Sequence, residues 1–363
     1  GGDALVVKGG IRKPGDLKGK TIAVQSFGPH VDYLTKVLAD AGLTMGDVKI
    51  KWMKDLTGTN DTPMAAFQGA GVDAAMVIIP DGLALTSGGV VGTGSEDSVK
   101  GARILLSTKT ANRIIADVYA VRSDYLESNR REVEKFVHGL MRAEEELAKL
   151  FKNPQGRAAE YKKMIAAAAE VLLDSPQAVG DTEGLYADCE FVGWKGNVRF
   201  FGDKDYPRSF TRLTAEIQRS FISLGLLGGK VALAHPQWDY DRLKEGIADV
   251  AGVATPRFDS KKVAKVISRK QQQGTLDEGV LFSFEVFFKP NQNSFPADMY
   301  EDSFKKVTEL ASTYGGAIIT VEGHSDPLNY LKKKKGGAAS LVLKQIKQSA
   351  RNLSLTRANA VRD

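Results

Sequence analysis

Two opposite charges near the end of the chain, Asp326 and Arg357, are the residues whose types and positions best suggest binding chemistry. Asp326 follows a strand-like run, Ala317–Glu322, and Arg357 lies in an amphipathic segment with helical spacing. If both face one pocket, the carboxylate can accept from an ammonium group while the guanidinium grips a carboxylate with two parallel hydrogen bonds. The pair therefore predicts a site for an amino-acid zwitterion. The alternative is that Asp326 caps the next turn and Arg357 is a solvated helix residue.

The residues around these charges resemble the signature of the OmpA-like peptidoglycan-binding domain. Its first part is matched by Gly323, His324, Ser325 and Asp326, and its second part by Asn352, Leu353, Ser354, Arg357, Ala358 and Val361. The resemblance implies that Asp326, Arg357 and Asn352 bind peptidoglycan, with Asp326 on the ammonium and Arg357 on the carboxylate of diaminopimelate. The gap between Asp326 and Arg357 is longer than in the family, and we interpret the extra piece, which includes Lys332–Lys335, as an inserted surface loop.

The rest of the C-terminal region has the order of elements expected of such a module. A strand is predicted at Leu281–Phe288, a helix at Met299–Tyr314 and a second strand at Ala317–Glu322. The helix-like segment then continues to Asp363, where the family adds a further strand. We therefore expect an α+β OmpA-like domain at 279–363 that lacks its C-terminal residues, and we interpret the chain as a fragment.

The front of the chain alternates short strand and helix patterns, which is typical of an α/β layered fold. The predicted strands are Thr21–Val24, Val48–Met53, Asp73–Ile79, Arg103–Ser107 and Val118–Val121, and the predicted helices are His30–Ala41, Pro63–Gly69, Arg130–Lys152, Gly156–Leu173 and Ser209–Leu224. The phrases Asp3–Leu43 and Phe67–Pro80 resemble the nitrate/sulfonate/taurine family of ABC-transporter solute-binding proteins. That resemblance implies a two-lobed periplasmic-binding-protein type II fold over residues 1–258, with the first lobe incomplete.

Polar residues at strand ends are the candidate ligand-binding residues of this front region. A loop that leads into a helix offers free N–H groups and the positive end of the helix dipole, which suits an anion. An equally open alternative for the segment Gln25–Gly28 is a plain strand–helix turn capped by Ser26. Phe27 or Trp52 could supply an aromatic wall of the binding site. The predicted ligand-binding residues are Gln25, Ser26, Phe27, Gly28, Thr59, Asn60, Pro80, Asp81 and Asp117.

Composition excludes several other classes of protein. The formal net charge of +6 comes without an arginine-rich arm, so no nucleic-acid partner is expected. No apolar run is long enough to span a membrane. The chain has one cysteine, Cys189, and no Cys or His spacing that predicts a metal site. The glycine-rich stretch Gly88–Ser98 lacks the pattern of a phosphate loop and is interpreted as a flexible connector.

Together these patterns predict a non-catalytic receptor of the periplasm or cell envelope, without a cofactor. Its expected partners are a small anionic or zwitterionic solute, peptidoglycan and an inner-membrane ABC permease. A solute-binding domain at 1–258 is followed by a polar linker at 259–278. Two alternatives stay open, namely an enzyme of thiamine-precursor synthesis on the same fold and a structural envelope protein with a non-binding front. The solute is not identified: a sulfonate, nitrate, an amine-bearing acid and a pyrimidine all remain candidates.

Overall fold

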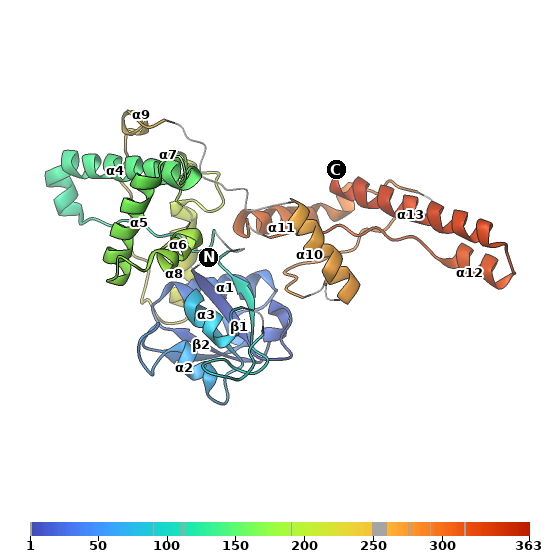
Figure 1. Cartoon of the computed structure of the whole chain (residues 1–363). Coiled ribbons are helices and arrows are strands. Elements are labelled where there is room, and N and C mark those ends of the chain that lie inside the picture. Colours follow the sequence, from blue (N-terminus) through green and yellow to red (C-terminus); the bar gives the residue numbers. More distant parts are fainter. Residues whose placement is uncertain are drawn as a thin grey trace. The chain divides into compact units, whose positions relative to one another are not determined.

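The computed structural model describes residues 2–363 except 90, 110, 112, 190, 249–259, 275, 277, 291 and 316. The chain divides into two compact units. The front unit comprises Gly1–Leu281 with Ala311–Gly316, and the back unit comprises Phe282–Leu310 with Ala317–Asp363 (Figure 1). The predicted boundary between residues 258 and 259 lies outside the described residues.

A mixed sheet of five strands organises the front unit and confirms the predicted α/β architecture. Its spatial order is β3-β2-β4-β1-β5. Strand β2 runs parallel to β3 and to β4, whereas β1 runs antiparallel to β4 and to β5. The strands are β1 Asp3–Val7, β2 Thr21–Gln25, β3 Lys49–Met53, β4 Ala74–Ile78 and β5 Arg103–Ser107.

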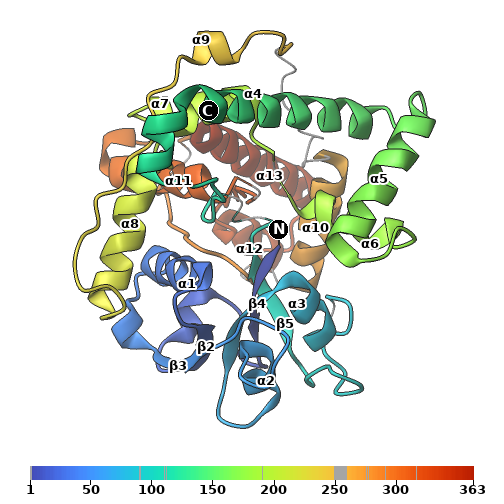
Figure 2. The ribbon, with the colours of Figure 1, turned by 90° about the vertical axis from the view of Figure 1, so that its left-hand side faces the viewer.

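Successive strand residues point to opposite sides of a sheet. Because consecutive residues of the central strands are apolar, both faces of this sheet are apolar, and helices cover both. On one face, the small residues Ala23 and Ala75 pack with Phe67 of α2 (Pro63–Gln68) and Leu85 of α3 (Ile79–Leu85). The alternate residues of β2 and β4 face the other way, where α1 (Pro29–Asp40) contacts both strands. Figure 2 shows the sheet between these helices. Central strands buried on both faces fit the apolar runs of the sequence.

A helical region follows the sheet in the front unit. Arg208 is buried and connects this region to the segment that leaves β5, since its guanidinium donates to the carbonyls of Arg113 and Ile114 and pairs with Glu216 at 2.8 Å. The helices are α4 Ser123–Lys152, α5 Ala158–Leu173, α6 Val179–Asp188, α7 Gly193–Gly202, α8 Phe210–Ser223, α9 Tyr240–Leu243 and α10 Ser260–Gln273.

One expectation for the front of the chain is wrong, and two others can be described further. Val118–Val121 is not a strand, and all four of its residues are exposed, so no buried ladder is available to them. Gly88–Ser98 lies between α3 and β5 and is held by a network of hydroxyl groups in which Thr93 Oγ1 contacts Ser95 Oγ at 2.7 Å. The expected linker at 259–278 contains helix α10.

The back unit is built from helices and extended segments. Short 3-10 helix Ala297–Tyr300 leads into α11 (Glu301–Thr313), and two further helices, α12 (Leu328–Lys335) and α13 (Ser340–Arg362), end the chain. Phe284 packs edge-on against Phe304 with ring centroids 5.3 Å apart, within a larger cluster of aromatic rings. These rings supply much of the apolar contact that a small unit needs.

The strands expected in the back unit are absent from its described residues. Leu281–Phe288 and Ala317–Glu322 are extended but form no ladder, so the predicted α+β OmpA-like fold is not seen there. A strand is stable only when its N–H and C=O groups find a partner strand. The predicted inserted loop at Lys332–Lys335 is also wrong, because these residues form the last turn of α12.

Candidate functional site

The carboxyl ends of three parallel strands, β2, β3 and β4, meet at one edge of the sheet. The antiparallel strand β1 begins at the same edge, where Asp3 pairs with Ile78. In open α/β sheets, ligands bind outside the carboxyl ends of the parallel strands. The predicted residues of the segments 25–28, 59–60 and 80–81 all follow these ends. Strand β5 also ends at this edge, since Ser107 pairs with Ala4 at the start of β1, and Asp117 lies ten residues further along, in an exposed segment.

The junction between β2 and α1 is fixed to the end of β3 by hydrogen bonds. Ser26 donates to the Met53 carbonyl through both its backbone N–H, at 3.0 Å, and its hydroxyl, at 3.2 Å. The Gln25 amide donates to the Lys54 carbonyl at 3.4 Å. Ser26 is therefore not the helix cap that one interpretation expected: its hydroxyl hydrogen is engaged, and toward a solute the oxygen offers acceptor capacity.

Phe27 is the most unusual residue of this junction. Its φ of 60° lies in the left-handed region, which disfavours a bulky side chain. The side chain is nevertheless 69% exposed, so core packing does not explain its presence. Strained residues persist where the surrounding structure holds them, and they cluster at ligand-binding sites. Phe27 directly precedes Gly28, the N-cap of α1, and no side chain caps the N-terminus of that helix.

Gly28 has a packing role at this junction. Its φ of −93° is open to any residue, so conformational freedom is not what the position needs. A Cβ at Gly28 would stand 2.4 Å from Gln25 Oε1. Glycine therefore lets the Gln25 amide lie across the start of α1 and reach the loop after β3.

The loop that joins β3 to α2 is closed on itself. Thr59 Oγ1 donates to Asp55 Oδ2 at 2.8 Å and accepts from the Asp61 N–H at 3.1 Å. The Asp55 N–H donates to the Asp61 carbonyl at 3.0 Å. Thr59 thus shapes the loop, and the exposed Asn60 beside it is the residue better placed to meet a solute.

Asp81 carries an unusual carboxylate in the first turn of α3, directly after the exposed Pro80. One of its oxygens, Oδ2, is buried and has no hydrogen-bond partner among the described residues. Burial raises the pKa of this carboxyl above its ordinary value. A buried acceptor without a donor is unfavourable, so this oxygen is left with an unmet hydrogen bond at the start of α3.

Beneath this edge lies an interaction that the sequence did not predict. His30 is fully buried in α1, and its Nε2 contacts Asp3 Oδ1 at 2.7 Å, which fixes the start of β1 to the start of α1. The other ring nitrogen, Nδ1, is buried without a partner among the described residues. The two residues are far apart in sequence, and no periodicity marks the contact. Only the antiparallel placement of β1 brings them together.

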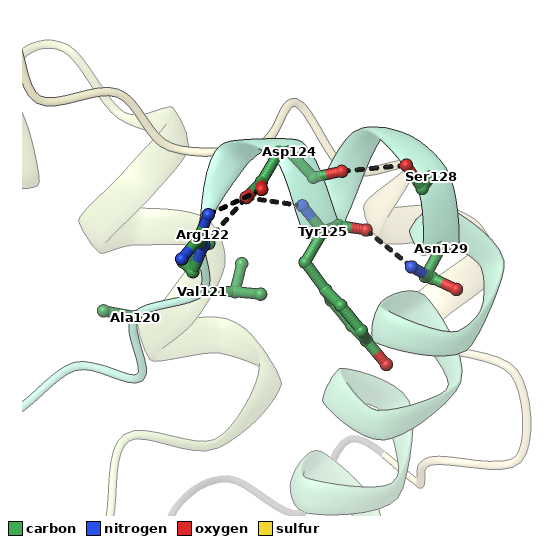
Figure 3. Close-up of a pocket in the computed structure, with 7 residues that line it drawn as sticks. All are labelled: Ala120, Val121, Arg122, Asp124, Tyr125, Ser128 and Asn129. Carbon is green, nitrogen blue, oxygen red and sulfur yellow. Dashed lines mark hydrogen bonds and ion pairs between the residues drawn. The ribbon is translucent and has the colours of Figure 1, made fainter.

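A shallow depression at the start of α4 offers less to a ligand (Figure 3). Arg122 and Asp124 form a two-pronged ion pair, and Asp124 also accepts from the Tyr125 N–H. The Ser128 hydroxyl donates to the Asp124 carbonyl, and the Asn129 amide donates to the Tyr125 carbonyl where α4 kinks. These polar groups satisfy one another, as the dashed lines in Figure 3 show.

In the back unit, Arg357 contacts the backbone of the segment 323–326, and Asp326 is part of that segment. Arg357 donates to the carbonyls of His324, Lys289 and Gln292 at 2.9–3.1 Å, and its guanidinium lies 5.1 Å from the centre of the Phe288 ring. Asp326 Oδ1 accepts from the Leu328 N–H at 2.8 Å at the start of α12. Asn352 is exposed and accepts from Gln348. Each predicted peptidoglycan-binding residue thus has a local partner.

Two other kinds of feature are absent from the part of the chain that the structure describes. No three His, Cys, Asp or Glu side chains are grouped so that they could bind a metal ion. No helix has both the length and the apolar character needed to cross a bilayer.

Part of the chain, including this edge of the sheet, is similar to known proteins. Residues 4–156 match the family model described as NMT1/THI5 like. The match spans strands β2–β5 and helices α1–α3, and so includes the candidate site. The family includes a thiamine-synthesis enzyme. None of the curated proteins matches the chain.

Three solved structures are similar to the chain at low identity. The alkanesulfonate-binding protein SsuA from Xanthomonas axonopodis pv. citri, bound to MOPS, is 20% identical over 62% of this chain and 65% of its own, with a TM-score of 0.35. The periplasmic aliphatic sulphonate binding protein SsuA from Escherichia coli is 17% identical over 66% of this chain and 68% of its own, with a TM-score of 0.37. A putative periplasmic sulfonate-binding protein from Methylobacillus flagellatus KT is 18% identical over 65% of this chain and 70% of its own, with a TM-score of 0.34. The chain thus spans about two thirds of the length of each.

Proposed function

We propose that the front unit is a small-solute receptor of an ABC-type uptake system and that it binds its solute at the carboxyl edge of β2, β3 and β4. The observation that carries this proposal is Phe27, an exposed aromatic residue in a left-handed backbone conformation at the start of α1. The family match supports the proposal, since it covers the three strand ends and the loops that follow them.

The charges at this edge favour a zwitterionic solute. The N-terminus of α1 presents the positive end of a twelve-residue helix, which suits an anionic group. The unpartnered oxygen of Asp81 suits an ammonium group. Strands β2 and β4 are neighbours in the sheet, and neighbouring strands lie about 5 Å apart. A short molecule with an ammonium at one end and a sulfonate or carboxylate at the other matches that spacing.

The decisive test separates the strain at Phe27 from its aromatic ring. Phe27→Gly removes both, so the free protein should gain up to about 1 kcal/mol in stability while solute affinity falls about tenfold. Phe27→Ala removes the ring but keeps the strain, so affinity should fall without the gain in stability. Glu96→Gly is the matched control, because Glu96 also has a left-handed φ, of 54°, but lies outside this edge.

The solute is to be identified by mass spectrometry of small molecules released from purified protein. Calorimetric titration of the full chain with taurine, nitrate and a hydroxymethylpyrimidine then gives Kd values for the wild type and the variants. Equal affinity of wild type and Phe27→Ala for the released solute would refute the placement of the site. Turnover of the pyrimidine with pyridoxal phosphate would instead favour the enzyme that the matched family includes.

We further propose that the back unit binds peptidoglycan through Asp326 and Arg357, which places the protein in the periplasm or cell envelope. Support comes from the hydrogen bond between Arg357 and the His324 carbonyl, two residues before Asp326. Retention of the full chain on isolated sacculi should drop for Asp326→Asn and for Arg357→Lys. Glu322→Gln, which changes an exposed carboxylate near the same segment, is the matched control. Unchanged retention of Asp326→Asn would rule out the assigned role.

A further inference from the structure

The hairpin formed by α12 and α13, residues 328–362, concentrates the positive charge of the chain. It holds nine of the 50 Lys and Arg side chains and none of the 44 Asp and Glu side chains. The whole chain has a net charge of +6, so the remaining residues carry −3. The basic character of this protein therefore comes entirely from the hairpin. The two helices lie side by side at the C-terminal end of the chain (Figure 1).

The two sides of α13 have different roles. One stripe, with Ile346, Ala350 and Leu353, is partly buried at helical spacing. It packs toward the segment 323–326, where the Ser325 hydroxyl donates to the Ala350 carbonyl at 3.1 Å. A Cβ at Gly323 would stand only 1.8 Å from the Ser354 carbonyl oxygen, so backbone and helix are in close contact. Because this inner stripe contacts the segment 323–326, the opposite side of α13 faces away from that segment.

The outer stripe of α13 combines cations with leucines. Residues three, four and seven apart share one side of a helix. By that spacing Lys344, Arg351 and Arg362 lie along one stripe with Leu341 and Leu355, all of them exposed. Leu341 is 68% exposed and Leu355 is 63% exposed, although both are large apolar residues. Solubility alone does not explain exposed leucines between the cations of this stripe.

Helix α12 extends this surface. Lys332, Lys333, Lys334 and Lys335 are exposed, and no ion pair to them is found among the described residues. The leucines of the same helix, Leu328 and Leu331, are about half exposed, at 49% and 52%. The hairpin thus presents exposed cations beside apolar side chains on both of its helices, and of these cations Arg362 pairs with Asp363 at 2.7 Å.

We propose that the α12–α13 hairpin docks on an anionic lipid surface. Helices with a basic polar side and exposed leucines lie in the interface of a bilayer, where the leucines enter the acyl boundary and the cations attract acidic headgroups. Long lysine stems reach the headgroups while the backbone stays above them. The leucines favour lipid over a nucleic acid, since single-stranded nucleic acids are held by aromatic stacking and the one aromatic residue of the hairpin, Tyr330, is half-buried.

This contact is independent of the proposed peptidoglycan site. Arg357 belongs to the inner stripe of α13 and donates to backbone carbonyls of the back unit. The lipid-facing cations lie on the outer stripe and on α12. One hairpin therefore has the means to contact the lipid surface with its outer side while its inner side supports the segment that carries Asp326.

The test is co-sedimentation of the full chain with vesicles of phosphatidylcholine alone or with 30 mol% phosphatidylglycerol. The wild type should bind the anionic vesicles and not the neutral ones. Quadruple Lys→Gln substitution at 332–335 keeps strong helix formers and should weaken binding by about fivefold for each cation removed. The matched control is quadruple Lys→Gln substitution at 162, 163, 204 and 230, which removes the same charge from exposed positions of the front unit and should bind like the wild type.

A second pair of variants tests the apolar part of the surface. Leu341→Ser with Leu355→Ser leaves every charge in place, and it should lower vesicle binding at least tenfold while circular dichroism still shows the helices. Equal loss of binding in both lysine quadruple variants would overturn the proposal, because it would reduce the effect to net charge. Vesicle binding unaffected by the leucine change, together with tight binding to duplex DNA, would also overturn it and assign the hairpin to a soluble polyanion.

Discussion

Asp32 provides the sharpest test of the packing between α1 and α8. Its side chain is only 5% exposed, and Oδ1 accepts from the Ser220 hydroxyl at 3.3 Å. The pKa of this carboxyl is raised from 3.8 to about 6, first by burial and second by the nearby carboxylate of Glu216, while Arg208, the Ser220 hydroxyl and Lys36 oppose the shift. A charged Asp32 is therefore unfavourable in the folded protein at neutral pH.

The sign of the effect follows from where the proton is held. Between about pH 4 and pH 6 the folded state keeps the proton on Asp32 and the unfolded state has lost it, so the free energy of unfolding falls as the pH rises through this window. A shift of about two units corresponds to about 3 kcal/mol. Asp32→Asn removes the ionisable group. This variant should be more stable than the wild type by about 2–3 kcal/mol at pH 7.5 and by only about 1 kcal/mol at pH 4.5.

Tryptophan fluorescence is a suitable probe, since Trp52, Trp194 and Trp238 all belong to the front unit. Denaturant unfolding of wild type and Asp32→Asn at pH 4.5, 6.0 and 7.5 gives the stability difference at each pH. Asp205→Asn serves as the control, because it removes an exposed carboxylate and should show no such trend. A difference that stays constant across the three pH values, or an Asp32→Asn variant that is the less stable at pH 7.5, would refute this account of the buried carboxyl.

The remaining predictions concern single contacts. Arg208→Met should lower front-unit stability by about 3–5 kcal/mol in the same fluorescence assay, because it leaves the carboxylate of Glu216 unpaired. Gly323→Ala should lower the thermal transition of the back unit, measured by helical circular dichroism, because its Cβ would overlap the Ser354 carbonyl. Cys189 is exposed and should react with a thiol reagent without denaturant, and a need for denaturant would contradict its placement.

Strands β4 and β5 could be predicted because each is a largely apolar run closed by turn residues. Asp73–Ile79 was expected and β4 spans Ala74–Ile78, while Arg103–Ser107 was expected and coincides with β5. Strand β1 was missed, although it is equally apolar. What makes it a strand is its antiparallel pairing with β4 and β5. Both partners are far from β1 in the sequence, so no local pattern indicates the pairing.

Helix α4 shows how a local backbone feature shifts a predicted boundary. The spacing of apolar residues predicts a helix that starts at Arg130, yet the helix begins at Ser123. Asn129 has φ −130° and ψ 30°, so it interrupts the helix as a cap would, but another helical segment precedes it. The ion pair of Arg122 with Asp124 supports that extra segment. Periodicity finds the buried side of a helix and says little about an exposed first turn.

The candidate site was predictable in place and less so in chemistry. The segments that end β2, β3 and β4 were identified because strand ends of one direction share an edge. What the sequence could not reveal is which polar groups are already engaged. Ser26 and Thr59 looked like free hydroxyl groups, yet each donates to a neighbouring backbone carbonyl or carboxylate. Asp81 is one of the predicted ligand-binding residues, but its unpartnered buried oxygen could not be foreseen from the sequence.

Arg357 is another polar residue, most of whose hydrogen-bonding groups are already engaged, and this affects how it could bind peptidoglycan. A guanidinium has five N–H groups, and three nitrogens of this one already donate to carbonyls of His324, Lys289 and Gln292. Two N–H groups are left, one on each terminal nitrogen, so Arg357 can grip a carboxylate with two parallel bonds only through this pair, or else by releasing some of these carbonyls. Arg357→Lys should thus weaken both the retention on sacculi and the stability of the back unit. Loss of stability with full retention would make Arg357 a support of the fold and leave Asp326 to bind peptidoglycan without it.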